Sequence, residues 1–523
     1  MVKKLINFPF YIFYFASFPV IALFAWNVSE IDISVIWRSL ILSNLVALFV
    51  FSIFWLVTRN TQKSGIMVSI LIVAFFSFGH LFGWLRSFPE IGESLGRFRY
   101  LVPFYMLIFI FAIYLIYFKI KDTAKITSIL NFVGIILIVF PILQATIYLV
   151  RINQKPDEVN IIFNERLTPA ENEPLPDIYF IVLDAYLRQD RLLEDYGYDN
   201  SEFIKKMREM GFYVADCSRS NYAHTDRSIP STLNMDYVQV LSREPAVSGM
   251  TITEDLIYKM EYNKTKLLLS ELGYKFVAFD SGAKWSSFST ADYYFPIKIN
   301  LAQKNITEFE ALLLKNSAAI IAVGGQQEKL FELIRKKDSD EINYWPNQIE
   351  SVRNILANLH KVPDLDGQKF IFAHIMKPHA PYVFLPDGSL LTDARYFSND
   401  GFGIDQKFSH KGYNMQVEFI NNQILPILEE IIHKSKTPPI ILIEGDHGYF
   451  DTDRFANLMA FYGPPKMLEE LYPTISPVNS LRTVFRTVFN GDYLPLQDIS
   501  YFEKCEKGKC TYQVAENPFL KCK

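Results

Sequence analysis

Five long apolar segments near the N-terminus constrain the fold of this chain more than any other feature of its sequence. They span residues 7–26, 39–57, 65–85, 101–118 and 128–150, and they carry almost no charge. Each is long enough to cross a hydrocarbon core of ~30 Å at ~1.5 Å per helical residue. A cleaved signal peptide would account for the first segment only, and so many buried helices in so short a stretch are not typical of a soluble protein. We therefore expect a transmembrane domain of five helices over residues 1–152.

The charged residues between these segments predict the orientation of the helices. One side carries mostly basic residues, namely the N-terminal MVKK, Arg59, Lys63, Lys119, Lys121 and Lys125. The opposite side carries a mixture of Arg38, Arg86, Arg97 and Arg99 with Glu90 and Glu93. By the positive-inside rule the first side, with the N-terminus, is cytoplasmic. The rest of the chain is then extracytoplasmic, either periplasmic or at the cell surface, and is attached to the inner or plasma membrane.

The cysteines agree with an oxidising compartment. All four, Cys217, Cys505, Cys510 and Cys522, follow the apolar segments and fall where disulfides persist. The turn-like interior of CEKGKC predicts a bond between Cys505 and Cys510, which leaves Cys217 to pair with Cys522. Zinc binding by these cysteines is the alternative, but no C-x-x-C spacing or nearby histidine supports it. The formal net charge of −4 gives no sign of a nucleic-acid partner.

Beyond the apolar segments, the pattern of the chain changes to that of an α/β domain. Residues 153–175 are polar and rich in proline, and they predict a linker. Continuous apolar runs that alternate with amphipathic stretches are typical of a mostly parallel sheet covered on both faces. We expect this domain over residues 176–500, followed by a cysteine-containing tail over 501–523, in a monomer. Strands are predicted at 178–184, 370–376 and 438–446. Helices are predicted at 413–434 and within 199–214, where the helix ends at Gly211.

Polar residues at the ends of the predicted strands are the first candidates for a functional site, because in open α/β sheets binding sites form beyond the carboxyl ends of the strands. This rule selects Asp184, Asp280, His374 and the adjacent pair Asp446 and His447. Asp184 alone fits a helix cap as well as a ligand. The glycines that flank the pair allow tight turns that would direct both side chains to one point. Carboxylates with an imidazole suit zinc or manganese rather than calcium.

The segment SNYAHTDRSIPSTLNM, residues 220–235, supplies a candidate nucleophile. Several hydroxyl side chains surround Pro230, near which we expect a helix to begin. Ser228 fits the role of a helix cap. Thr225 beside a metal ion would have a different use, because the metal stabilises the alkoxide and makes it a nucleophile at neutral pH. The start of a helix would also attract an anion such as a phosphate.

In their order along the chain, these motifs resemble the alkaline phosphatase/sulfatase superfamily. The motifs are the strand that ends at Asp184, TDRSIP from Thr225, HIMKPHAP from His374, and GDHG from Gly445. The resemblance extends roughly over residues 176–470. Within the superfamily the chain looks most like two classes of membrane-anchored phosphotransferase, the lipid A phosphoethanolamine transferases and the lipoteichoic acid synthases. Those enzymes have five N-terminal transmembrane helices and an extracytoplasmic catalytic domain.

The resemblance implies a set of roles for residues of this chain. It makes Thr225 the nucleophile, and His379 the residue that hydrogen-bonds the phosphoryl group or protonates the leaving alcohol. His374 matches a second site position, for which a buried structural histidine is an equally good interpretation. The implied metal ligands are Asp184, Thr225, Asp446 and His447.

The chain departs from the family pattern in two places. The phosphoethanolamine transferases have glutamate where this chain has Asp184, which is shorter by one methylene. They also have a further histidine after the DHG motif, whereas no histidine follows His447 here. Asn457 is the plausible polar substitute, and we take it with Ser228 as a candidate substrate contact. The number of metal ions therefore stays open between one and two.

These features together predict an integral-membrane, metal-dependent phosphotransferase of the cell envelope. It would move a phospho-head group from a lipid-type donor, through Thr225, to a hydroxyl of a glycan or lipid. One alternative is a sulfatase-like hydrolase with the same site, acting as a phosphodiesterase, phosphatase or sulfuric ester hydrolase. Neither Cys217 nor Ser228 lies in the C/S-x-P-x-R motif that formylglycine formation requires. The second alternative is an inactive scaffold of envelope assembly.

Overall fold

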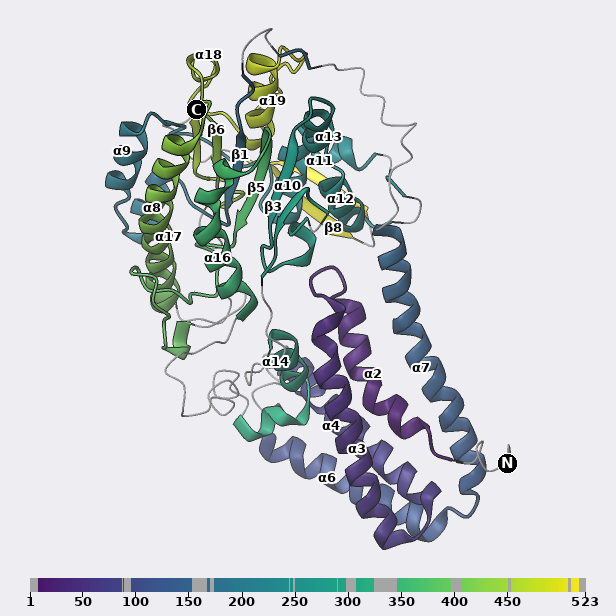
Figure 1. The fold of residues 1–523 in the computed structure, drawn as a ribbon. Coiled ribbons are helices and arrows are strands. Elements are labelled where there is room, and N and C mark those ends of the chain that lie inside the picture. The colour runs from purple at the N-terminus through teal and green to yellow at the C-terminus, as the bar shows by residue number, and fades with distance from the viewer. Residues whose placement is uncertain are drawn as a thin grey trace. The chain divides into compact units, whose positions relative to one another are not determined.

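The computed structural model divides the chain into two compact units, and each is described here by itself (Figure 1). The helical unit comprises Met1–Val150 and Asn300–Tyr344, and the α/β unit comprises Arg151–Ile299 and Trp345–Lys523. Within them the structure describes residues 8–86, 88, 96–152, 167–169, 174–243, 245–247, 250–288, 290–297, 307–323, 346–396, 406–449, 453–506 and 509–516.

The apolar segments form long helices, as the sequence predicts. Four are long and apolar enough to cross a membrane, over Ile33–Thr58, Thr61–Arg86, Phe98–Lys119 and Thr123–Ile152. Many of their large apolar side chains are exposed, including Phe49, Leu107 and Phe140, as expected for contact with lipid. The elements are α2 (Tyr11–Trp26), η1 (Ile33–Ile36), α3 (Trp37–Thr58), α4 (Thr61–Arg86), α6 (Phe98–Tyr114), η2 (Leu115–Lys119) and α7 (Thr123–Ile152).

The first of the five predicted spans is shorter than expected. Helix α2 has 16 residues, which at ~1.5 Å per residue gives about 24 Å, less than a hydrocarbon core of ~30 Å. It is nevertheless apolar and packs with α3 and α4 through Tyr11, Ile12 and Ala16. The start of the predicted segment, before residue 8, lies outside the described residues.

A segment that the sequence assigns to the catalytic range packs instead with the apolar helices. It contains α14 (Glu308–Lys315) and η4 (Ala318–Val323). Ile320 is buried with Phe78 and Phe82 of α4. Arg38 at the start of α3 donates to Glu310 of α14 over 2.6 Å. The predicted α/β range of 176–500 is therefore interrupted by a part of the helical unit, since the apolar side chains of this segment are buried against α4.

The α/β unit contains a seven-stranded mixed sheet in the order β2-β7-β6-β1-β5-β3-β4. The pairs β1·β5, β1·β6, β3·β5 and β3·β4 are parallel, and β2 and β7 are paired antiparallel at one edge. The predicted α/β domain with a mostly parallel sheet is thus confirmed. The strands are β1 (Ile178–Leu183), β2 (Tyr213–Val214), β3 (Lys275–Phe279), β4 (Tyr293–Phe295), β5 (Lys369–Ile375), β6 (Ile440–Glu444) and β7 (Met459–Tyr462).

Helices cover both faces of this sheet, which is why its central strand β1 is apolar along its whole length. Every residue of β1 is buried. Ile178, Phe180 and Val182 face a core to which α10, α13 and α19 contribute, whereas α16 contacts β3, β4 and β5 and packs beside α17. The helices are α8 (Gln189–Tyr196), α9 (Ser201–Glu209), α10 (Thr225–Asn234), α11 (Val238–Leu241), α12 (Ile252–Glu261), α13 (Lys264–Glu271), α16 (Pro346–Asn358), α17 (Gln406–Lys434), α18 (Pro465–Leu468) and α19 (Pro477–Val488), with short turns η3 (Lys284–Ser286), η5 (Leu359–Asp364) and η6 (Ala394–Tyr396).

The cysteine-containing tail begins with a hairpin of β8 (Tyr501–Glu506) and β9 (Lys509–Val514). Cys505 and Cys510 face each other across it and form the predicted disulfide. Cys217 is also disulfide-bonded. Its predicted partner, Cys522, lies outside the described residues, so that pairing stays a prediction.

The contact between α4 and the segment that follows α14 generates a test of the helical unit. A Cβ atom added at Gly79 would collide with the backbone of Asn316, whereas one added at Gly83 of the same helix meets nothing within 4 Å. We expect Gly79→Ala to lower the free energy of unfolding by about 1–3 kcal/mol through overpacking. The matched Gly83→Ala should raise it by up to ~1 kcal/mol, because alanine favours a helix more than glycine does. Thermal unfolding in detergent measures both, and equal effects would contradict this packing.

Candidate active site and metal centre

The site lies where the central strands end. Asp184 directly follows β1, and Asp446 and His447 follow β6 after one glycine. Because β1 and β6 pair in parallel, their carboxyl ends lie next to each other. One ligand atom from each of the three side chains lies within 4.8 Å of the other two, and all three residues are buried. Strand pairing thus brings together residues that are more than 250 positions apart in the sequence, as the 261-residue separation of Ala185 and Asp446 shows.

The chemistry of these side chains fits a divalent cation. Asp446 Oδ1 accepts a hydrogen bond of 2.9 Å from the backbone N–H of Ala185. Among the residues that the structure describes, no hydrogen-bond donor reaches the buried atoms Asp184 Oδ1 and Asp446 Oδ2. Burying a carboxylate oxygen without a partner is costly, and a bound cation would remove that cost. Two carboxylates and one imidazole are a donor set that zinc and manganese accept.

The tautomer of His447 also fits a metal ligand. Its Nδ1 lies 2.7 Å from the carbonyl oxygen of Gly448. Since a carbonyl oxygen only accepts, Nδ1 carries the proton and Nε2 presents its lone pair. Nε2 lies 3.6 Å from Asp446 Oδ2 and 3.9 Å from Asp184 Oδ1. A hydrogen bond on the far nitrogen that fixes the ring in this way is typical of ligating histidines.

Thr225 is the first residue of α10 and faces this cluster. Its Oγ1 lies 3.2 Å from His447 Nε2, and its side chain is only partly buried. His224 before it is extended, with φ −142° and ψ 140°, and the first intrahelical bond runs from Ser228 N to His224 O at 2.9 Å. The helix therefore begins at Thr225 rather than near Pro230 as the sequence suggested. The backbone N–H groups of the first turn therefore lie close to the hydroxyl.

The predicted histidines take different positions. His374 is fully buried near the end of β5, with Nε2 3.4 Å from Asp184 Oδ2 and Nδ1 3.1 Å from Ser286 Oγ. Within the described residues its Nε2 has no hydrogen-bond partner, so it contacts the Asp184 carboxylate at ion-pair distance only. His379 is partly exposed, and its backbone N–H donates to Asp184 O over 3.1 Å. Its Nδ1 lies 2.7 Å from Ala380 O.

Three other polar candidates have structural hydrogen bonds. Ser228 Oγ donates to Tyr222 O at 3.0 Å and is buried. Asn457 is fully buried, with Nδ2 donating to Gly445 O at 2.6 Å and Oδ1 accepting from Ser218 Oγ at 3.0 Å. Asp280 accepts from Gly282 N at 3.0 Å, and it follows β3, which is separated from β1 by β5. A substrate contact for Ser228 and Asn457 stays a prediction.

Glu444 is a residue that the sequence reasoning missed. It is the last residue of β6, is fully buried, and accepts a hydrogen bond of 3.2 Å from Thr232 of α10. Burial and the neighbouring Asp446 carboxylate raise the pKa of Glu444 well above its usual range. Burial also raises the pKa of Asp184, but the charges and hydrogen bonds of His379, His374 and His447 lower it by more, so that its net shift is downward. The sequence signal that could have identified Glu444 is an acidic residue at the end of the otherwise apolar run IILIE.

The glycines of the DHG motif serve close packing. A Cβ atom at Gly445 would collide with the carbonyl oxygen of Tyr186, and one at Gly448 with that of Asp453. Neither glycine is among the described residues with a positive φ. The two glycines therefore allow the backbone of Tyr186 and of Asp453 to approach the loop that carries Asp446 and His447. They do not supply the tight turn that the sequence suggested.

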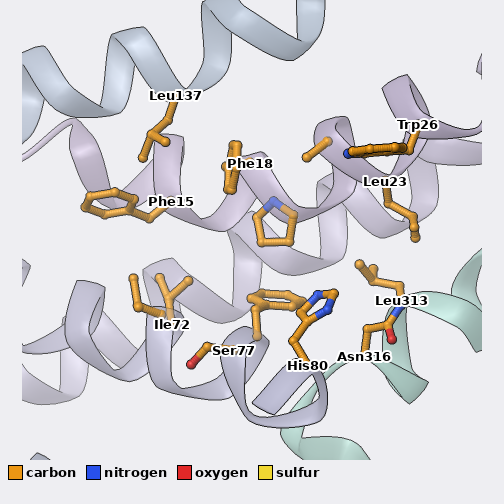
Figure 2. A pocket seen from close by; sticks show the side chains of 14 residues that line it. Phe15, Phe18, Leu23, Trp26, Ile72, Ser77, His80, Leu137, Leu313 and Asn316 are labelled. Atoms are coloured by element: carbon orange, nitrogen blue, oxygen red, sulfur yellow. The ribbon is translucent and has the colours of Figure 1, made fainter. Parts of the chain in front are cut away.

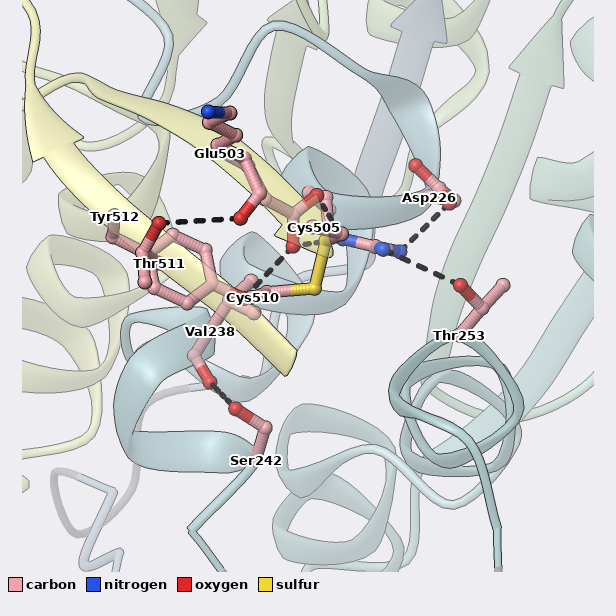
Figure 3. The surroundings of a disulfide bond; sticks show 11 residues. Asp226, Val238, Ser242, Thr253, Glu503, Cys505, Cys510, Thr511 and Tyr512 are labelled. Carbon is pink, nitrogen blue, oxygen red and sulfur yellow. Dashed lines mark hydrogen bonds and ion pairs between the residues drawn. A yellow bond between two sulfur atoms is a disulfide. The ribbon is translucent and has the colours of Figure 1, made fainter. Parts of the chain in front are cut away.

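The disulfide-linked hairpin of β8 and β9 contacts the start of α10 (Figure 3). Arg227 of α10 donates from Nε to both carboxylate oxygens of Glu503 in β8, at 3.0 and 2.9 Å. Its NH1 group donates to Asp226 over 2.7 Å. Tyr512 of β9 donates to Glu503 over 2.9 Å. The ion pair and the hairpin thus fix the helical turn that carries Thr225.

Substituting a ligand generates the first test of the site. Asp446→Asn keeps the shape and the acceptor for Ala185 N but removes the charge. We expect zinc affinity to fall by at least about tenfold, while the metal-free protein becomes more stable because one buried charge is gone. Calorimetry with Zn²⁺ and melting temperatures with and without chelator measure this. Asp216→Asn, at an exposed ion pair, is the control, and unchanged affinity in Asp446→Asn would refute the assignment.

The link between hairpin and helix generates a second test. Glu503→Gln removes the partner of Arg227, whose side chain is only 8% exposed, and should lower the free energy of unfolding by about 1–3 kcal/mol. The control is Glu470→Gln, which breaks an exposed 3.0 Å pair with Arg486 and should cost only ~0–1 kcal/mol. Denaturant unfolding in detergent compares them. Equal losses would show that the ion pair does not fix α10.

Comparison with known proteins gives structural similarities only. No family model and no curated protein matches the chain. The zinc complex of the C-terminal periplasmic domain of EcEptC from Escherichia coli has a TM-score of 0.39 at 10% identity, covering 63% of this chain and 87% of that one. The integral membrane protein lipooligosaccharide phosphoethanolamine transferase A from Neisseria meningitidis has a TM-score of 0.39 at 10% identity, covering 94% and 97%. The lipoteichoic acid synthase LtaP from Listeria monocytogenes has a TM-score of 0.36 at 11% identity, covering 60% and 72%. These are the two enzyme classes whose motif order the chain resembles, but at such TM-scores a function has to be argued from the residues of the site.

Proposed function

We propose that the chain is a metal-dependent phosphotransferase of the cell envelope. The observation that carries the proposal is the position of Thr225, whose hydroxyl faces a buried cluster of Asp184, Asp446 and His447. A threonine at the start of a helix and beside such a cluster is positioned to act as a hydroxyl nucleophile once a metal ion is bound. The same arrangement disfavours an inactive scaffold, since buried carboxylates without a ligand would only destabilise the fold.

The residues that would hold the cation are Asp184, Asp446 and His447, with Thr225 Oγ1 as the fourth donor. When bound, zinc or manganese would stabilise the threonine alkoxide and neutralise charge on the phosphoryl oxygens. His374 keeps the Asp184 carboxylate in place, and the Nδ1 hydrogen bond keeps the His447 ring in place. The first turn of α10 presents backbone N–H groups to the phosphoryl oxygens.

The reaction proceeds in two displacements at phosphorus. Thr225 loses its proton to solvent and its Oγ attacks a phosphodiester, so that a Thr–O–P bond forms and the bond to the donor alcohol breaks. His379, as the imidazolium, gives its proton to the departing alkoxide. In the second displacement the acceptor hydroxyl gives its proton to the neutral His379 and attacks the phosphothreonine. The bond between Thr225 Oγ and phosphorus breaks, and Thr225 takes back a proton from solvent.

Basic groups near Thr225 favour an anionic substrate. Burial lowers the pKa of Arg454, and burial together with the positive charge of Arg454 lowers that of His224. His224 therefore lies within electrostatic range of Arg454. Arg219 and Arg227 are paired with Asp453 and Glu503. The N-terminus of α10, with these basic groups around it, is suited to receive a phosphodiester.

The apolar helices indicate where donor and acceptor come from. A lipid donor reaches the site from the bilayer in which these helices lie, and the acceptor is a hydroxyl of a glycan or lipid of the envelope. The distribution of lysines and arginines supports a cytoplasmic N-terminus and an extracytoplasmic α/β unit. A hydrolase with the same site would differ only in that water resolves the phosphothreonine.

The nucleophile is tested by trapping the intermediate. The full-length protein, with Zn²⁺ or Mn²⁺, is incubated with phosphatidylethanolamine or phosphatidylglycerol and quenched in acid. Intact mass and peptide mass spectrometry should find a phospho-head group on Thr225. Thr225→Ala should show no adduct and a turnover lower by at least about a thousandfold, because the covalent route is gone.

The control for this test is Thr511→Ala, which removes an exposed hydroxyl of β9 and should behave as the wild type. Full turnover by Thr225→Ala would refute the proposed nucleophile. Release of the head group at the same rate with and without an added acceptor would identify the hydrolase instead.

A further inference from the structure

A cavity of about 500 Å³ lies within the helical unit (Figure 2). It is bounded by α2 and α4, with Leu137 of α7 and with Leu313 and Asn316 at the end of α14. Its volume is within the ~300–1,000 Å³ range of pockets that hold small-molecule ligands. The site around Thr225 belongs to the α/β unit, so this cavity is a separate feature of the chain.

The lining of the cavity changes character along its length. At one end Figure 2 shows Phe15, Ile72 and Leu137, which are all apolar. At the other end it shows Trp26, His80 and Asn316. Phe15 and Trp26 lie on α2, and Ile72 and His80 on α4, so on both helices the lining runs from apolar to polar toward the C-terminal end. A molecule that fits this lining has an apolar length and a polar end.

The depth of the cavity matches one leaflet of a bilayer. From Phe15 to Trp26 along α2 the rise is about 16 Å at ~1.5 Å per residue. This is about half of a hydrocarbon core of ~30 Å. Trp26 is 81% exposed, and tryptophan at the end of a membrane helix marks the interface with the head groups. The polar end of the cavity therefore lies at the level of the head groups, and the apolar end near the bilayer centre.

The two polar residues at that end are His80, which is exposed, and Asn316, which is half-buried. A histidine in a membrane-spanning helix is rare and usually functional, and His80 follows Gly79, the position at which the backbone of Asn316 touches α4. This contact holds the Asn316 amide in the wall of the cavity. Imidazole and amide N–H groups are suitable donors for the oxygens of a phosphate.

We propose that this cavity is a binding site for a membrane glycerophospholipid, with one acyl chain along α2 and α4 and the phosphate at His80 and Asn316. With the proposed orientation of the helices, the lipid belongs to the outer leaflet. Binding here needs no chemistry at Thr225. The cavity would hold a lipid within the helical unit of an enzyme that itself uses lipids. This is a function beyond the transfer reaction.

Depth-resolved photolabelling tests the proposal on the unmodified full-length protein. Nanodiscs of phosphatidylcholine carry one of two phosphatidylethanolamine probes, with a diazirine either at the end of the acyl chain or next to its ester. After irradiation, peptide mass spectrometry maps the labelled residues. The chain-end probe should label the region of Phe15 and Ile72, and the ester-side probe that of Leu23 and Leu313. Labels spread over exposed positions such as Phe49 and Phe140 in both cases would overturn the proposal.

Variants add a test of occupancy. Ala22→Phe fills the cavity from α2 and should lower labelling at the lining by about tenfold, since each displaced methylene weakens binding. Val46→Phe on α3, where Val46 is 52% exposed, is the matched control and should label as the wild type. Unchanged labelling in a folded Ala22→Phe, judged by its elution profile and melting temperature, would overturn the proposal. If Ala22→Phe does not fold, the depth map of the wild type decides.

The polar end and the independence from catalysis are tested with two more variants. A diacylglycerol probe with the same photoreactive chain lacks the phosphate, and wild type should label with it several-fold less than with phosphatidylethanolamine. His80→Ala should remove this difference, and an unchanged difference would overturn the role of His80. Thr225→Ala should keep full labelling, so that loss of the transferase activity and loss of lipid binding are separate outcomes.

Discussion

The parallel pairing of β1 with β6 is the interaction on which the candidate site depends. It places Asp184 beside Asp446 and His447, and it does so in the centre of a sheet covered by helices on both faces. The low dielectric there makes unpaired carboxylates costly and a cation that joins them correspondingly stabilising. The rest of the site is built around this pairing, since α10 brings Thr225 to the same edge and His374 of the neighbouring strand β5 supports Asp184.

Most of the fold, and the side chains that meet at the ends of its central strands, could be predicted from the sequence, because both depend on local patterns. Continuous apolar runs identified β1, β5 and β6, and the rule that sites form at carboxyl ends selected Asp184, Asp446 and His447 before any contact was known. Strand order is not a local property, so the sequence could not say that β1 lies between β5 and β6. The ligand role of these residues stays a proposal until a metal is measured.

Two features could not be read from local patterns because they depend on long-range packing. The apolar character of residues 307–323 is compatible with either unit, and only its burial against Phe78 and Phe82 assigns it to the helical unit. The start of α10 was placed too late because Pro230 suggested a first turn. The backbone of His224 is extended instead, and the helix begins at Thr225, which puts the nucleophile candidate at the N-terminus of the helix.

The position of Asn457 bears on the number of metal ions. Both ends of its amide are engaged, with Gly445 O and Ser218 Oγ, so that it holds the exit of β6 in place. Within the described residues, the cluster of Asp184, Asp446 and His447 is the one group of buried potential ligands near Thr225. A single ion there would balance less of the charge of a transferring phosphoryl group than two ions would. The start of α10 and His379 would then have to supply the remaining stabilisation, which makes them as important to the proposed reaction as the ligands.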